Sequence, residues 1–347
     1  MMKVVRFGVD GTALAGAKSA SELLNEESAK LPIYTFCQEL DDLLGGGVAV
    51  GEITELCGCP GIGKTQMCIQ LCCSVQIPNA FGGHEGSAVY VDTEGSFMAE
   101  RARDVAAAAA DHLGAIARAN PEDQAMADAM ASFNTERVLD RIHLFRCHEV
   151  AELLAVLETL PEYCARHGVR LVVVDSVAFH FRQDFRDMAL RTTILAKTTN
   201  RLMSLANSAQ LAVCTVNQVT VKPDPGDGGG ARLVPALGES YAHACTTRVI
   251  LSWEEDVRTA YLYKSPRLPQ GRARYTVTGG GEGRAGDETS RRVTTRRRSA
   301  STPIFFLHRR RPRRSRVSTC TWWSSPCWTR PDPALCSPPR TPTRRCR

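Results

Sequence analysis

One short run of residues has the types and spacing needed to hold a phosphate chain. It comprises Gly58, Cys59, Pro60, Gly61, Ile62, Gly63, Lys64 and Thr65, which fit the pattern G-x-x-x-x-G-K-[ST]. The glycines let backbone N–H groups close around phosphates, and a helix that begins directly afterwards adds the positive end of its dipole. We expect Lys64 to bridge the β- and γ-phosphates and Thr65 to ligate Mg²⁺. The run therefore predicts a site for ATP and Mg²⁺; a glycine-rich turn before a helix is the competing interpretation.

Two acidic residues could complete this chemistry. Asp175 ends the apolar run Leu171-Val-Val-Val, where it would be the second protein ligand of the Mg²⁺ ion. Glu94 follows the run Val89-Tyr-Val-Asp-Thr, and from a strand tip it could orient the water that attacks the γ-phosphate. Each acid also has a plainer interpretation, since Asp175 could simply end a strand and Glu94 could cap the helix expected near Ser96. Together with the phosphate-binding run, the two acids favour ATP hydrolysis.

The elements that position these residues follow from an alternation of apolar, β-branched runs with helical patterns. Strands are expected at 52–57, 88–92, 142–147, 170–175 and 211–217. Helices are expected at 63–75, 98–110, 150–167 and 189–206, and a short one at 19–28. This alternation predicts an α/β fold in which helices cover both faces of a mostly parallel sheet. The later runs 246–253, 258–265 and 272–278 predict an antiparallel C-terminal extension of that sheet.

Composition divides the chain into three parts. Residues 1–30 form a small, polar lead-in, residues 31–278 carry the α/β pattern, and residues 279–347 form a tail with 17 Arg and no Lys. The tail is expected to be disordered, and its amino-acid composition is typical of a GC-rich gene segment translated through an intron or out of frame. The competing interpretation is that its Arg runs form a nuclear-import or phosphate-binding patch.

The net charge of +6 hides opposite balances in the two ends of the chain. The tail contributes +13, which leaves −7 for residues 1–279. A mildly acidic core argues against general attraction to nucleic acid, so any DNA contact must come from local patches. We expect an intracellular, soluble protein, because no apolar run is long enough to span a membrane and the N-terminus lacks a secretory signal. The 14 Cys include no CxxC pair, and we expect most of them to pack as small hydrophobes.

Several segments together resemble the RecA-type recombinases of eukaryotes and archaea: LDDLLGGGV, VYVDTEGSF, LVVVDS, TVNQV and LGESYAHACTTRVIL. The resemblance covers about residues 33–278. Further segments, including VQIPNAFGG, FRCHEVAELLAVL and LYKSP, are similar to the C member of the eukaryotic recombinase paralogues. The resemblance implies a RecA-like ATPase core and a role in homologous recombination and double-strand-break repair, in mitotic and meiotic cells. It also implies work in hetero-oligomers with sister paralogues.

The resemblance assigns roles to individual residues. Gln218 occupies the position that couples the γ-phosphate to the DNA-binding loops, and His243 would be a second sensor of the nucleotide state. Arg101 matches the position that packs on the adenine. Residues 263–266 resemble the segment that caps ATP bound to a neighbouring subunit.

In this family DNA is bound by two mobile loops, which map to residues 179–187 and 219–235. The candidates that they carry are Arg182, Arg186, Lys222 and Arg232, together with Phe181 and Phe185. Basic residues interleaved with aromatic ones suit neutralisation of the DNA backbone combined with base stacking. The alternatives are that the phenylalanines pack under the first loop and that the second loop is merely solvated. Because the core is acidic, we expect this subunit alone to bind DNA weakly and in a salt-sensitive way.

Two features depart from the family pattern. Thirty residues cannot hold the small helical DNA-binding domain that most members carry before the core, so contacts from that domain are expected to be absent. The Phe-x-x-Ala tether that links one subunit to the next is not evident, and the helix at 19–28 is a candidate substitute.

Three functional hypotheses remain. The first is a Mg²⁺- and ATP-dependent DNA-binding ATPase that acts on single-stranded and branched DNA, with other paralogues and the main strand-exchange recombinase as partners. The second is an assembly scaffold in which ATP is structural and hydrolysis is dispensable. The third is a hexameric RecA-fold helicase or motor, which fits the phosphate-binding run alone. The family further implies a nuclear location with some cytoplasmic protein, and no membrane partner is expected.

Overall fold

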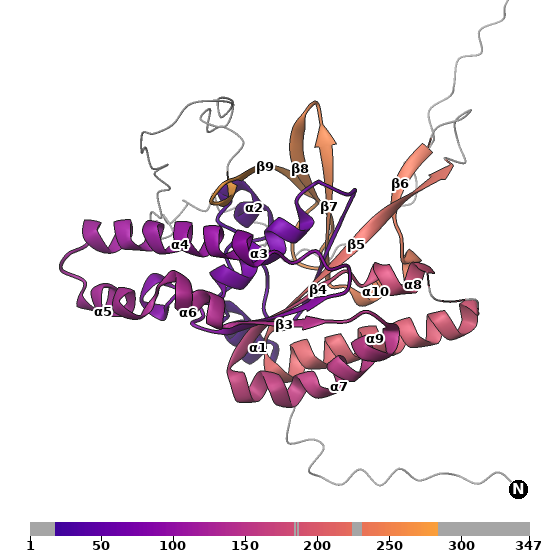
Figure 1. Ribbon diagram of the computed structural model, residues 1–347, viewed down its shortest axis with the longest axis horizontal. Helices are drawn as coiled ribbons and strands as arrows, with labels where there is room; N and C mark the ends of the chain where they lie inside the picture. The colour runs from indigo at the N-terminus through magenta and orange to yellow at the C-terminus, as the bar shows by residue number, and fades with distance from the viewer. Residues whose placement is uncertain (1–17, 184, 186, 224–230, 284–347) are drawn as a thin grey trace, which may run out of the picture. The chain divides into compact units, whose positions relative to one another are not determined.

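The fold is built around one mixed sheet (Figure 1). The computed structural model describes residues 18–183, 185, 187–223 and 231–283. Within these residues the sheet has ten strands: nine lie in the order β10-β9-β8-β7-β1-β5-β4-β2-β3, and the tenth, β6, pairs with β5 outside this path. The strands are β1 (Ile53–Gly58), β2 (Ser87–Asp92), β3 (Ile142–Arg146), β4 (Val169–Asp175), β5 (Ala212–Pro223), β6 (Ala231–Pro235), β7 (Thr247–Glu254), β8 (Val257–Lys264), β9 (Gly271–Thr278) and β10 (Gly281–Gly283).

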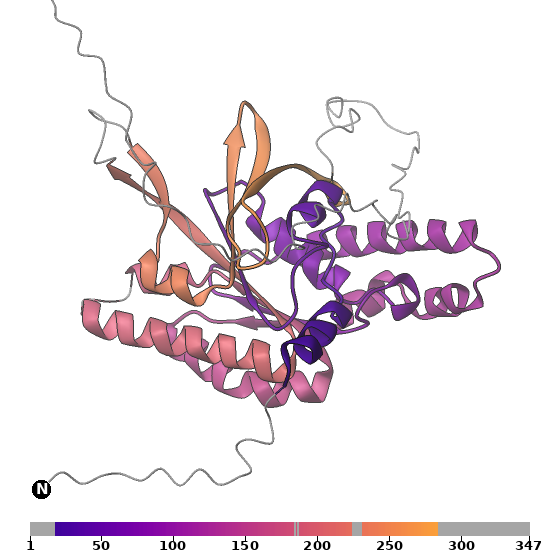
Figure 2. The ribbon, with the colours of Figure 1, turned by 180° about the vertical axis from the view of Figure 1, so that it is seen from behind.

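Helices cover both faces of the sheet. One face carries α2 (Gln38–Leu43), α3 (Lys64–Ser74), α4 (Ala99–Ala119), α5 (Gln124–Ser132) and α6 (Thr135–Asp140), and the other carries α7 (Val150–His167) and α9 (Met188–Ala209). Figure 2 shows the same two layers from behind. Three short helices complete the described chain: α1 (Ala20–Ala29), α8 (Ala178–Gln183) and α10 (Gly238–Ala244), besides a 3₁₀ turn at Asn79–Phe81. The expected α/β class is confirmed.

The central strands are parallel, as the alternation of strands and helices requires. β1 pairs in parallel with both β5 and β7, and β4 lies between β5 and β2. β8, β9 and β10 then add antiparallel strands beyond β7. The predicted extension is therefore confirmed, with one correction: its first strand, β7, joins the sheet in parallel with β1. The strand β10 also adds three residues beyond the boundary placed at Thr278.

The two expected DNA loops contain regular structure. Residues 219–223 and 231–235 form an antiparallel ribbon of β5 with β6, which we call the β5–β6 ribbon. The expectation of a loop over this stretch was wrong, because the β-branched residues from Val219 to Val221 continue the strand. The expected loop at 179–187 includes the helix α8. Residues 224–230, and the Arg-rich text from 284 onwards, lie outside the described residues.

Five of the described helices were not predicted from the sequence: α2, α5, α6, α8 and α10. The helices α5 and α6 lie in one stretch, residues 120–141, in which α5 buries no side chain and α6 buries only Val138. Their starts are nevertheless marked by side chains, because Asp123 accepts a hydrogen bond from the N–H of Met126 and Asn134 accepts one from the N–H of Arg137. Capping, rather than apolar periodicity, was the signal for this pair.

The cysteines of the described core pack as expected. Cys68, Cys72 and Cys73 on α3 are fully buried with Cys214 of β5 in the core on the α3 face. Burial raises the pKa of the Cys72 thiol well above its ordinary value, so this thiol is held in its neutral form. Among the described residues no helix is both long and apolar enough to cross a membrane.

Packing of α9 on the sheet can be tested with two leucines of that helix. Leu202 is buried in the core beneath α7 and α9, so Leu202→Ala should lower the free energy of unfolding by about 2–5 kcal/mol through lost burial and a new cavity. Leu190 is 51% exposed, and Leu190→Ala should change it by less than about 0.5 kcal/mol. Urea unfolding followed by circular dichroism measures both, and equal losses would contradict this packing.

Candidate functional site

The phosphate-binding run, hereafter the P-loop (residues 58–65), connects β1 to α3. Gly61 and Gly63 have φ of 77° and 116°, in the left-handed region that glycine adopts without strain. Gly58 has no room for a side chain, since a Cβ there would lie 2.8 Å from the carbonyl oxygen of Leu251. The loop is anchored at Ile62, which is buried and whose carbonyl oxygen accepts a hydrogen bond of 3.0 Å from the Tyr275 hydroxyl. The backbone is thus shaped as the motif predicts.

Lys64 is held at the mouth of this loop. Its side chain is buried, and Nζ donates to the carbonyl oxygens of Gly58 at 2.8 Å and Cys59 at 3.0 Å. The pKa of Lys64 lies below its ordinary value because of burial, and the nearby carboxylates of Asp175 and Glu94 oppose this lowering. The ammonium group therefore sits on backbone oxygens that phosphate oxygens could replace.

Asp175 gathers three hydroxyl groups on a single carboxylate oxygen. Its Oδ2 accepts from Thr65 Oγ1 at 2.6 Å, from the Tyr90 hydroxyl at 2.7 Å and from Ser96 Oγ at 3.3 Å. Burial raises the pKa of Asp175, and the hydrogen bonds from Thr65 and Tyr90 oppose that rise. The two residues predicted to bind Mg²⁺, Thr65 and Asp175, are therefore in direct contact. Tyr90 and Ser96 were not predicted, because in the sequence Tyr90 reads only as part of an apolar strand.

Glu94 and Gln218 also meet, although 124 positions separate them. Gln218 Nε2 donates to Glu94 Oε1 at 3.3 Å, and the Ser176 hydroxyl donates to the same oxygen. The register of the sheet places this contact beside the P-loop, because Gly58 of the P-loop is the partner of Gln218 on β5. The carboxylate that could orient water and the residue assigned to coupling thus lie together beside the P-loop. Ser176 is a further contact that the sequence did not indicate.

The start of α4 has no side-chain cap, and the backbone that leads into this helix is held by Asp92 rather than by Glu94. The carboxylate of Asp92 accepts from the backbone N–H groups of Ser96 at 3.0 Å and Phe97 at 3.2 Å. Asp92 is almost fully buried, whereas Glu94 is exposed. Glu94 is therefore not occupied in holding the start of α4.

A cavity of about 370 Å³ opens between these groups. It is lined by Pro60, Glu94, Phe179, Arg182 and Gln218. The P-loop contributes Pro60 and the first candidate DNA segment contributes Phe179 and Arg182, so one space borders both. Its size and its lining by a carboxylate, an amide and a guanidinium suit a polar, charged ligand.

The residues present fit Mg²⁺-bound ATP. The left-handed glycines leave backbone N–H groups free of side-chain obstruction, Lys64 supplies a cation, and Thr65 with Asp175 supplies two oxygen ligands. Among the described residues there is no group of three or more His, Cys, Asp or Glu side chains that could coordinate a metal ion by themselves. Phosphate oxygens would therefore have to complete the coordination of Mg²⁺, as in other P-loop sites.

Two residues assigned by the resemblance have other partners within the chain. The guanidinium of Arg101 donates to Gln66 Oε1 and to the carbonyl oxygens of Thr278, at 2.6 Å, and Gly279. It thereby ties α4 to α3 and to the end of β9. Contact of Arg101 with adenine stays a prediction.

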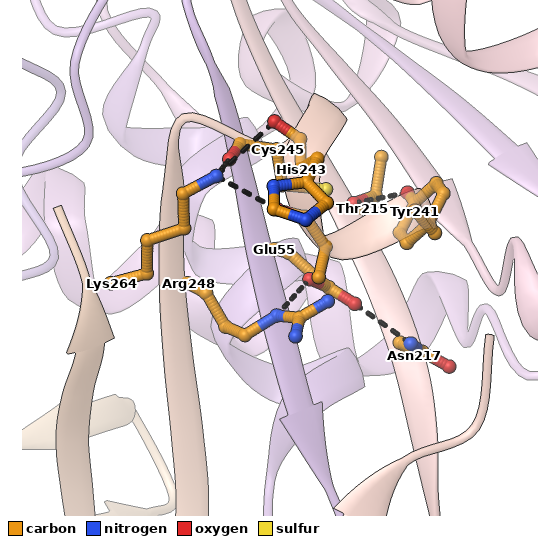
Figure 3. Close-up of polar contacts among 9 residues, drawn as sticks. Glu55, Thr215, Asn217, Tyr241, His243, Cys245, Arg248 and Lys264 are labelled. Atoms are coloured by element: carbon orange, nitrogen blue, oxygen red, sulfur yellow. Dashed lines mark hydrogen bonds and ion pairs between the residues drawn. The ribbon is translucent and has the colours of Figure 1, made fainter. Parts of the chain in front are cut away.

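His243 is exposed on the last turn of α10. Lys264, within the 263–266 segment, donates to the carbonyl oxygens of Ala242 at 2.8 Å, His243 at 3.2 Å and Cys245 at 2.7 Å (Figure 3). A cation at the C-terminal end of a helix satisfies carbonyls that lack partners within it. The sensing role of His243 and the capping of a neighbour's ATP by this segment stay predictions.

The candidate DNA-binding residues divide into three groups. Arg182 is exposed on α8 and borders the cavity. Lys222 and Arg232 are register partners across the β5–β6 ribbon, and Arg186 lies outside the described residues. Phe181 is only 1% exposed and its ring stacks on that of Phe185, with centroids 5.5 Å apart. Phe181 therefore packs under its segment, and base stacking by that residue is ruled out in this conformation.

Comparison with known proteins shows that the chain is similar to recombinases. The Rad51 family model matches residues 26–126 and 118–284. DNA repair protein RAD51 homolog 3 of Cricetulus griseus is 45% identical over 270 residues, which cover 77% of this chain and 73% of that protein. The protein of the same name from Dictyostelium discoideum is 40% identical over 252 residues, covering 72% of this chain and 65% of its own length.

More distant recombinases match the same region. The DNA repair and recombination protein RadA of Aeropyrum pernix is 34% identical over 265 residues, 75% of this chain and 76% of its own length. RadA of Metallosphaera sedula is 34% identical over 269 residues, with 76% of each chain covered.

Substitution of Asp175 tests the buried carboxylate. Because burial raises the pKa of Asp175, burying this group costs no charge at pH values below the ordinary carboxyl pKa, and the cost grows as pH rises through the folded pKa. Asp175→Asn should therefore raise the midpoint of thermal unfolding of the nucleotide-free chain, most at about pH 8 and little at about pH 4. The added stabilisation by Mg²⁺ and ATP should disappear. Scanning fluorimetry across this range measures both effects, and a lower midpoint at pH 8 would contradict the assignment.

Proposed function

The chain belongs to the Rad51 family, and from that premise we propose that it is a Mg²⁺- and ATP-dependent, DNA-binding ATPase of homologous recombination and double-strand-break repair. The observation that carries the proposal is the meeting of Glu94 with Gln218 beside the P-loop. One cavity borders these two side chains and Arg182 on α8. The groups proposed for ATP hydrolysis and a candidate DNA-contacting segment therefore line the same cavity.

Binding of the triphosphate is the task of the P-loop. Its backbone N–H groups and the N-terminus of α3 face the phosphates, and Lys64 moves its hydrogen bonds from loop carbonyls to phosphate oxygens. Thr65 and Asp175 hold the metal ion from the protein side. When bound, ATP would supply the phosphoanhydride bond, and Mg²⁺ held by Thr65 and Asp175 would neutralise part of the developing negative charge. The protein contributes mainly positioning and electrostatic stabilisation.

Glu94 orients the attacking water. Its carboxylate is exposed towards the cavity, and Ser176 and Gln218 fix one of its two oxygens, which leaves the other for a water molecule. Gln218 also begins the stretch that runs into the β5–β6 ribbon. A change in the contact between Glu94 and Gln218 would therefore reach the ribbon through one continuous strand.

The partners follow from the family and from the names of the relatives. Two relatives are called DNA repair proteins and two are called DNA repair and recombination proteins. We assign single-stranded and branched DNA as ligands, and other recombinase paralogues and the main strand-exchange recombinase as partners in hetero-oligomers. We also propose a nuclear location, with some protein in the cytoplasm, as the family resemblance implies.

Turnover distinguishes an ATPase from a scaffold with structural ATP. In the full chain Glu94→Gln should retain ATP binding and lower DNA-stimulated hydrolysis about 10²-fold or more, because the amide cannot accept a proton from water. Lys64→Ala serves as the blank for contaminating ATPase and should lose both binding and hydrolysis. Release of phosphate measures turnover, and a labelled-nucleotide assay measures binding.

Two results would count against this assignment. Hydrolysis by wild type that is no greater than that of Lys64→Ala would favour the scaffold or a site completed by a partner. Hydrolysis by Glu94→Gln at the wild-type rate would show that another group orients the water.

DNA contact by α8 is tested with two exposed arginines. Arg182→Ala should weaken binding of single-stranded DNA at all sequences and reduce the slope of log affinity against log salt by about 1, because one phosphate contact is lost. Arg166→Ala on α7, with a side chain 67% exposed, is the matched control and should change neither. Fluorescence anisotropy at several salt concentrations measures both, and equal effects of the two variants would contradict a specific role for Arg182.

A further inference from the structure

A charged network lies inside the sheet, away from the groups proposed for hydrolysis. The side chains of Glu55 on β1 and Arg248 on β7 are 0% and 4% exposed. Arg248 Nε donates to Glu55 Oε2 at 2.5 Å, and Asn217 Nδ2 of β5 donates to Glu55 Oε1 at 2.7 Å (Figure 3). Each oxygen of one carboxylate thus binds a different neighbouring strand. We call these three residues the Glu55 network.

Stability alone does not account for this arrangement. Burial by itself lowers the pKa of Arg248, but the opposing effects of Glu55, Cys57 and Cys245 leave this pKa above its ordinary value, so the buried guanidinium is charged. Taking two charges out of water is costly, and apolar residues of similar volume are often at least as stabilising as a buried ion pair. Losing only one partner is strongly unfavourable, however, because it leaves a charge buried alone. The network therefore adds little net stability, but any movement that separates one of the three strands from the others is costly.

The strands joined by the network lead to the nucleotide site. Three residues beyond Glu55, β1 ends at Gly58, the first residue of the P-loop. Asn217 directly precedes Gln218, which contacts Glu94 and is followed by the β5–β6 ribbon. A shift of β1 that accompanies nucleotide binding must therefore carry β5 with it or break a buried, charge-assisted hydrogen bond.

The other end of the ribbon is tied to the same strands through α10. The Tyr241 hydroxyl of α10 donates to Thr215 Oγ1 of β5 at 2.9 Å, and Thr215 is the register partner of Glu55. Lys264, the register partner of Arg248, holds the carbonyls at the end of α10. These side chains come from β1, β5, β7, β8 and α10, and Figure 3 shows them gathered in one region of the sheet. Both ends of the ribbon are thus held by residues in or directly beside the network.

We propose that Glu55, Arg248 and Asn217 are positioning residues that transmit nucleotide binding at the P-loop to the β5–β6 ribbon. This inference rests on the proposed function, because it requires a nucleotide at residues 58–65. Arg248 Nη2 and Asn217 Oδ1 have no hydrogen-bond partner among the described residues. The network therefore has one donor and one acceptor available when a strand shifts.

Hydrogen–deuterium exchange of the full chain, with and without Mg²⁺ and a non-hydrolysable ATP analogue, tests this proposal. In wild type the analogue should slow exchange in residues 58–65 and change it at least threefold in residues 212–223. The double variant Glu55→Gln/Arg248→Met removes both charges together. It should keep the P-loop response and lose most of the ribbon response.

Two further variants make the result specific. Glu158→Gln/Arg201→Met makes the same chemical change in an ion pair between α7 and α9 whose side chains are more than half exposed, and it should respond as wild type does. Asn217→Leu removes only the link to β5, leaves the ion pair intact and should also lose the ribbon response. It serves as the test if the double variant does not fold, which thermal unfolding will show.

The outcomes separate the inference from the proposed function. No P-loop response in wild type would overturn the proposed function, and this inference with it. A P-loop response without a ribbon response in wild type, or a full ribbon response in either network variant, would overturn the inference alone.

Discussion

The parallel pairing of β1 with β5 on one side and β7 on the other is the constraint on which the site depends. Parallel strands end at the same edge of a sheet, so the P-loop after β1 and the groups after β2, β4 and β5 are brought to one place. Gly58 faces Gln218, and Asp92 faces Asp175, as register partners. If β1 slipped by one residue, the side chains of that strand would exchange faces, and the Glu55 carboxylate could no longer bind its two neighbours.

Buried polar groups also lie at that edge of the sheet. Asp175 is a carboxylate that water does not solvate, and three hydroxyl groups compensate for it in part. Lys64 is a buried ammonium that uses the carbonyls of its own loop. Lys64 and Asp175 therefore bond to neutral groups and not to each other, so both can bind a ligand. Such an arrangement is typical of binding sites in which function costs some stability.

The sequence predicted what is encoded locally and missed what depends on distant contacts. The P-loop, Asp175 and Glu94 each carry their signal within a few residues, and the α/β class follows from apolar periodicity over the whole chain. The hydroxyl of Tyr90 and the partners of Glu55 could not be placed, because strand order decides them. Glu55 nevertheless had a signal: a carboxylate within an apolar strand needs a buried partner. The ribbon was mistaken for a loop because glycine and proline at 223–230 outweighed the β-branched residues before them.

A crystal structure of the chain with Mg²⁺ and a non-hydrolysable ATP analogue tests the central claim most directly. We expect the phosphates to be enclosed by residues 58–65, with Lys64 Nζ moved from the carbonyls of Gly58 and Cys59 to phosphate oxygens. We also expect Mg²⁺ beside Thr65 and Asp175, and a water molecule between Glu94 and the γ-phosphate. A nucleotide bound elsewhere, or Lys64 still on its loop carbonyls with nucleotide present, would contradict the account.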